Sequence, residues 1–205
     1  MKLRPIATAV ILSIAAAACA NSSEIPPGDR PGISYSHAAD SLVLRIDTSG
    51  GFVPPSYAVG QIPGFSVFGD GRVITTGAQI EIYPQPALPP VLLATVDAGG
   101  MQDILRAALD AGLGSDADYT GLGSTLVADA PTTTFTLAVN GATHTVRVYA
   151  LGELGTRPDT MTPDEYAARR ALLRFSMQMG DLRGFLPPGS LSDDTAYTPD
   201  ACASS

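Results

Sequence analysis

Several residue types are scarce in this chain of 205 residues, and each scarcity excludes a kind of chemistry. There is no tryptophan, Lys2 is the only lysine, and there are two histidines and two cysteines. A lone lysine at the N-terminus excludes a Schiff-base lysine or a P-loop lysine in the body of the protein. Two histidines are too few for a histidine-rich zinc site. Arginine is the only fixed cation that remains.

Positive charge and long apolar runs are scarce as well. The chain has 12 Lys and Arg against 20 Asp and Glu, a formal charge of −8. Binding to phosphates needs clustered basic residues, so we expect no nucleic-acid partner. The longest largely apolar run, residues 6–20, is shorter than the roughly 20 apolar residues of a membrane-spanning helix. The length and the 45% hydrophobic content indicate one globular domain with a core.

Residues 1–18 have the three parts of a secretory signal peptide. Lys2 and Arg4 supply a positive start, an apolar stretch follows, and small residues lead to Cys19. The segment Ala16-Ala17-Ala18-Cys19 resembles the lipobox of bacterial lipoproteins, with Ala16 where leucine is commonest. That resemblance implies cleavage before Cys19 and a diacylglycerol on its sulfur. Removing residues 1–18 takes away two positive charges and changes the formal charge from −8 to −10.

Cys19 also admits other interpretations. Ala18-Cys19-Ala20 fits cleavage by an ordinary signal peptidase, which would release a secreted protein that begins at Asn21. Cys19 and Cys202 are the two cysteines and are free to pair in an oxidising compartment. An uncleaved anchor is the third alternative, although the run is too short to span well. We favour lipid attachment at Cys19, which places the protein on the extracytoplasmic face of the cell membrane.

The chain after Cys19 changes character at Ser41. Residues 19–40 are rich in Ser, Pro and Gly and predict a tether, in which His37 has no fixed geometry. Residues 41–186 predict a single domain, since no break in composition divides them. Residues 187–205 predict a disordered acidic tail that contains Cys202.

Alternating apolar residues predict about six to seven strands in the domain. These are SLVLRID at 41–47, two strands joined by Asp70-Gly71, QIEIY at 79–83, VLLATV at 91–96, and a hairpin around Asn140-Gly141. An Asn-Gly type I′ turn sets the register of that hairpin, with Leu137 opposite His144 and Phe135 opposite Val146. His144 then lies at the edge of the apolar face.

Two segments switch to helical periodicity. Residues 98–111 carry an apolar stripe and end before Gly112. The second helix begins at Thr162 as N-cap, with Pro163 and Glu165 in the first turn. The order of elements predicts an α+β fold, an antiparallel sheet with both helices on one face. The domain also resembles uncharacterised secreted lipoproteins of actinobacteria through GDGRVI, QIEIYP and ADAPTTTF, a likeness that implies no activity, fold or cofactor.

No motif identifies a reaction, and the candidate residues have simple structural interpretations. Asp116, Asp118 and Thr120 match the first positions of an EF-hand loop, but position 12 is Val127, so we favour a polar turn over calcium binding. The loop TSGGFVPPSY contains Phe52 and Tyr57, which we expect to fold back onto the core.

We therefore predict a non-enzymatic binding module with an envelope protein or the cell wall as partner. The alternative is a secreted hydrolase that uses acidic residues and His144. A binding module predicts an exposed apolar patch around Phe52 and Tyr57, whereas a hydrolase predicts a cleft lined with acids.

Overall fold

The computed structural model describes residues 31–53, 61–78, 89–121, 128–153 and 155–197. The chain divides into two compact units, Met1–Pro31 and Gly32–Ser205. Cys19 and Cys202 lie outside the described residues, so lipid attachment at Cys19 stays a prediction. Among the described residues, no helix is both long and apolar enough to cross a membrane.

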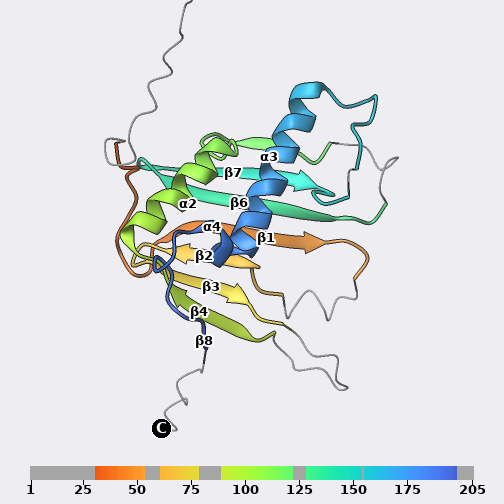
Figure 1. Cartoon of the computed structure of the whole chain (residues 1–205). Coiled ribbons are helices and arrows are strands. Elements are labelled where there is room, and N and C mark those ends of the chain that lie inside the picture. The colour runs from red at the N-terminus through yellow and green to blue at the C-terminus, as the bar shows by residue number, and fades with distance from the viewer. Residues whose placement is uncertain (1–30, 54–60, 79–88, 122–127, 154, 198–205) are drawn as a thin grey trace, which may run out of the picture. The chain divides into compact units, whose positions relative to one another are not determined.

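The domain is built on one open sheet of eight strands in the order β5-β7-β6-β1-β2-β3-β4-β8 (Figure 1). The strands are β1 Leu42–Gly50, β2 Phe65–Phe68, β3 Arg72–Thr76, β4 Val91–Thr95, β5 Ala117–Tyr119, β6 Pro131–Val139, β7 Ala142–Tyr149 and β8 Thr195–Ala196. Every neighbouring pair is antiparallel except β5 and β7, which are parallel. The α+β class is confirmed. The purely antiparallel sheet of six to seven strands is wrong, because the sheet is mixed and has eight strands.

The helices are α2 Ala98–Asp110, α3 Pro163–Gly180 and the short α4 Leu182–Phe185. Figure 1 shows α2 and α3 crossing the same face of the sheet, as predicted. Asp97 caps α2, its Oδ1 accepting from the Gly100 N–H at 2.7 Å, and Gly112 ends the helix at φ 94°. Thr162 caps α3 by accepting from the Glu165 N–H at 3.2 Å, so both predicted helix starts are confirmed.

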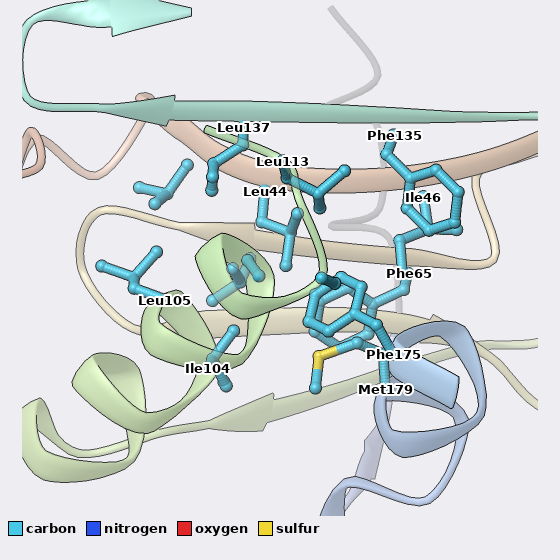
Figure 2. Packing of buried hydrophobic residues seen from close by; sticks show 14 of the residues in the cluster. Leu44, Ile46, Phe65, Ile104, Leu105, Leu113, Phe135, Leu137, Phe175 and Met179 are labelled. Atoms are coloured by element: carbon cyan, nitrogen blue, oxygen red, sulfur yellow. The ribbon is translucent and has the colours of Figure 1, made fainter. Parts of the chain in front are cut away.

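The core fills the space between the two helices and the sheet (Figure 2). Leu44 and Leu137 of the sheet and Ile104 of α2 are completely buried. Phe175 of α3 meets Phe135 of β6 with ring centroids 6.3 Å apart. Tilted aromatic pairs at this spacing add to the hydrophobic stabilisation of a core. This packing holds α3 against the middle of the sheet.

The hairpin of β6 and β7 has the predicted register at every position. Asn140 and Gly141 both have positive φ (52° and 77°), as a type I′ turn requires. Leu137 pairs with His144 and Phe135 with Val146. Sequence alone is sufficient here because the turn and the alternation of the two strands agree.

Three strands differ from the predictions. In β1 the register shifts between Leu42 and Leu44, so Val43 is buried and the simple alternation fails at that end. Strand β5 has only three residues, too few for an alternating pattern to indicate a strand. Its segment is part of the polar turn expected around Asp118. Strand β8 lies in the predicted tail. The predicted strand at 79–83 lies outside the described residues.

The predicted tether and tail both overlap the domain. Residues 32–40, called the strap below, pack on the domain, nine residues before the boundary predicted at Ser41. His37, predicted to have no fixed geometry, lies against Tyr35 with ring centroids 4.4 Å apart, so that prediction is wrong. Residues 187–197 are not disordered either, since the Ser192 N–H donates to the Thr95 carbonyl at 2.9 Å and β8 pairs with β4.

Candidate functional site

The most exposed large apolar side chain among the described residues is Phe52, which follows directly after β1. Phe52 is 91% exposed and the next residue, Val53, is 38% exposed. The prediction that the aromatic side chains of this loop fold back onto the core is therefore wrong for Phe52. Tyr57, the second aromatic residue of that prediction, lies outside the described residues. Residues 51–53 are called the Phe52 tip below.

The backbone of the Phe52 tip is fixed although its side chain is exposed. Gly50 and Gly51 have φ of 84° and 83°, a backbone region that residues other than glycine rarely adopt. The Phe52 N–H donates to the Asp129 carbonyl at 3.2 Å, and the Val53 N–H donates to the Gly51 carbonyl at 3.0 Å. A Cβ on Gly51 would lie 3.1 Å from that Asp129 oxygen, so the close approach also favours glycine. The turn thus aims Phe52 away from the core.

A second layer of hydrogen bonds supports the Asp129 side of this contact. The Ala130 N–H donates to the Tyr149 hydroxyl at 3.1 Å, and the Ala150 N–H donates to the Pro131 carbonyl at 2.9 Å. The beginning of β6 and the end of β7 are therefore joined directly behind the tip. Backbone groups satisfied in this way keep an irregular segment in one conformation.

The electrostatics near the tip are acidic. Asp129 and Glu153 are both exposed, and neither forms an ion pair with any described residue. Glu153 belongs to this end of the sheet because its N–H donates to the Ala150 carbonyl at 3.1 Å. The exposed Phe52 thus has Asp129 as its backbone neighbour, and Glu153 lies at the same end of the sheet.

His144 occupies the core-edge position expected from the hairpin register. It is half-buried opposite Leu137. Within the described residues, no ion pair or hydrogen bond joins His144 to a carboxylate. Asp116 accepts from the Thr145 N–H at 2.6 Å and so binds the backbone next to His144.

The acidic segment compared with an EF-hand contains strand β5, with Asp118 as its middle residue. Asp118 Oδ1 accepts from the Thr120 N–H at 2.8 Å and from the Thr120 hydroxyl, and Asp118 Oδ2 lies 3.5 Å from Arg147 NH1. These contacts, the hydroxyl first, lower the pKa of the Asp118 carboxyl. The part of the chain that the structure describes contains no group of three or more potential metal ligands. The predicted polar turn is wrong for residues 117–119, which pair with β7 as a strand, and the Asp118 carboxylate is occupied by Thr120 and Arg147.

The face of the sheet away from the helices is polar. Thr132, Thr134 and Thr136 alternate along β6 and are half-buried, and Thr134 lies opposite Arg147. Threonine is a favoured residue of solvent-facing strands, so this row is accounted for by β-propensity. The Phe52 tip has no such explanation, because a large exposed aromatic ring gains nothing from folding.

Arg169 is a residue whose burial the sequence did not indicate. Its side chain is 3% exposed and lies 3.3 Å from Glu165 Oε1, while it donates to the Tyr149 and Tyr119 carbonyls. Desolvation lowers the pKa of Arg169, and the Glu165 carboxylate partly opposes that shift. Arg169 joins α3 to the ends of β5 and β7 and is therefore a structural residue behind this end of the sheet.

The chain matches no family model, no curated protein and no solved structure.

Proposed function

We propose that the protein is a non-enzymatic binding module, attached to the extracytoplasmic face of the cell membrane through a lipid on Cys19. The contact surface in this proposal is the Phe52 tip. One observation carries it: Phe52 is 91% exposed on a turn that two positive-φ glycines allow and that a hydrogen bond to Asp129 holds. Aromatic side chains presented rigidly lose little conformational entropy on binding and are enriched among the residues that dominate interfaces.

The anchoring half of the proposal rests on the sequence before the domain. A positive start, an apolar stretch and small residues precede Cys19. The domain begins at Gly32, so residues 20–31 lie between the lipid and the first packed residue. Twelve residues can span at most about 40 Å, enough to separate a folded body from lipid headgroups. The exposed Phe52 tip and the lipobox-like segment before Cys19 together favour a tethered binding module.

Metabolic labelling tests the anchor. Cells that express the full chain are grown with a clickable palmitate analogue, and the wild type is compared with Cys19→Ala and Cys202→Ala. We expect label on the wild type and on Cys202→Ala, and none on Cys19→Ala. Cys202→Ala is the matched control because it removes the other cysteine. An unlabelled wild type, or label that persists on Cys19→Ala, would contradict the anchor.

A further inference from the structure

The strap is fixed at one end of the sheet. The Asn140 N–H donates to the Ser34 carbonyl at 2.8 Å, and the Ser34 N–H donates to Asn140 Oδ1 at 3.2 Å. Next to this pair, the Gln102 side chain binds both backbone groups of Ile33, at 2.7 and 3.0 Å. The chain therefore enters the domain at the turn between β6 and β7, beside α2 (Figure 1).

The Phe52 tip lies at the other end of the same strands. Gly50, directly before the tip, pairs with Pro131, the first residue of β6, whereas Asn140 follows Val139, the last residue of β6. A strand of nine residues is roughly 25–30 Å long at about 3.3 Å per residue. The strap end and the tip end of the domain are thus separated by the length of β6, as Figure 1 also shows.

The two carboxylates at the tip end favour a protein over a lipid surface as its partner. Asp129 and Glu153 lie at the tip end, and the chain carries a formal charge of −8. Membrane contact by an exposed aromatic residue is normally supported by basic residues that attract anionic headgroups. Carboxylates at this position oppose such contact. They complement a partner whose apolar pocket is bordered by Arg or Lys.

The exposure of Phe52 differs from ordinary surface exposure. Met177 on α3 and Tyr197 after β8 are also exposed, at 66% and 53%, but each stands alone on a different element. Scattered apolar side chains are common on protein surfaces and need no partner. Phe52 is instead followed by the exposed Val53 and held outward by backbone geometry that only glycine supplies freely.

We infer that the Phe52 tip inserts into an apolar, basic-rimmed pocket of a protein partner on the side of the domain away from the strap. This inference rests on the proposed function and names the kind of partner. The strap end then faces the anchoring membrane, and the tip end faces outward. The tether alone would not impose this orientation, because a span of about 40 Å also lets the domain turn over.

Site-specific photo-crosslinking in intact cells tests the inference on the full chain. A photoreactive amino acid replaces Phe52, Thr143 near the strap end, or Met177 on α3, one position at a time. We expect a discrete protein adduct from position 52 and no such adduct from positions 143 and 177. A lipid adduct from position 52 at least as abundant as that from position 143 would overturn the inference. So would the absence of any protein adduct from position 52.

A second arrangement tests the aromatic ring and the charge separately. The photoreactive group is placed at position 53, with Phe52 either retained or replaced by Ala. We expect Phe52→Ala to lower the adduct yield about tenfold or more, since a buried aromatic anchor dominates such contacts. Glu153→Lys should lower the yield further than Glu153→Gln, because Gln removes the charge and Lys reverses it, and Glu153 has no positive φ to preserve. Equal yields from all four chains would overturn the inference.

Repeating the position-52 experiment in the Cys19→Ala chain separates the two proposals. A protein adduct that persists in an unlipidated chain shows that the contact is real and the anchor dispensable. Palmitate-analogue label that depends on Cys19, without a protein adduct at position 52, would support the anchor and overturn the contact.

Discussion

Arg169 offers the sharpest test of how this domain is held together. Its guanidinium is 3% exposed and binds the carbonyls of Tyr149, at 2.9 Å, and of Tyr119. These two residues end β7 and β5, the only parallel pair among the described strands. Arg169→Met keeps the apolar volume of the side chain but removes every donor. The two backbone carbonyls cannot be replaced by mutation, so both lose the hydrogen bond from the guanidinium while they remain part-buried.

The expected magnitude follows from these contacts. A hydrogen bond from a charged donor contributes about 1.5–3 kcal/mol, and two are lost. Methionine avoids the desolvation cost of burying the guanidinium, which offsets part of that loss. We expect Arg169→Met to lower the free energy of unfolding by about 2–3 kcal/mol, and the melting temperature by about 5–10 °C for a domain of this size. The free energy of unfolding of Arg169→Lys should lie between those of the wild type and Arg169→Met, because one ammonium cannot reproduce the planar set of donors of a guanidinium.

Thermal and urea unfolding followed by circular dichroism measure this difference. Arg170→Met is the matched control, since Arg170 is the next residue on α3 and is exposed. We expect it to change the free energy of unfolding by less than about 0.5 kcal/mol. An Arg169→Met protein as stable as the wild type, or no less stable than Arg170→Met, would refute the assignment of Arg169 as the link between α3 and the two strand ends.

Three further predictions concern the strap, Asp118 of β5 and the Phe52 tip. A Cβ on Gly69 would lie 2.1 Å from the Ser36 carbonyl oxygen and would push the strap away. Gly69→Ala should therefore speed amide hydrogen exchange of the strap at least about tenfold. Gly64→Ala is the control and should leave exchange unchanged, because the space around Gly64 is open. The pKa of Asp118 is lowered from 3.8, so the ionised carboxylate stabilises the fold above pH 3.8, and this stabilisation is lost as the pH falls below that value. The free energy of unfolding of Asp118→Asn should therefore fall less steeply on acidification than that of the wild type. Phe52→Ala should leave the melting temperature within about 1–2 °C of the wild type, because Phe52 is 91% exposed. A larger fall would mean that the ring packs on the domain.

The elements that sequence alone predicted well are those in which two local signals agree. The hairpin of β6 and β7 combines an Asn-Gly turn with two strictly alternating strands, and its register is confirmed from Thr132 to Tyr149. The start of α3 combines Thr162 as N-cap with a proline in the first turn. Local signals of this kind do not depend on what the rest of the chain does.

The elements that sequence missed depend on contacts between distant segments. Strand β5 has three residues, and its parallel pairing rests on β7 and on Arg169, 50 residues away from Tyr119. Strand β8 and the strap contain no periodic pattern, and they are ordered by β4, Gln102 and Asn140. No local rule reports such tertiary stabilisation.

The exposure of Phe52 illustrates the same limit for the site. Two consecutive glycines before an aromatic residue indicate an unusual backbone, but both an inward and an outward ring satisfy that pattern. The hydrogen bond from Phe52 to Asp129, 77 positions along the chain, sets the direction. Asp129 itself adopts positive φ (58°), which its neighbours in the sequence do not signal.

The central claim, a binding module held at the membrane through Cys19, is tested most directly by the intact mass of the protein isolated from the membrane fraction. The account predicts a chain that begins at Cys19 and carries the added mass of a diacylglyceryl group, absent from Cys19→Ala. An unmodified wild-type chain that begins at Asn21 would contradict it.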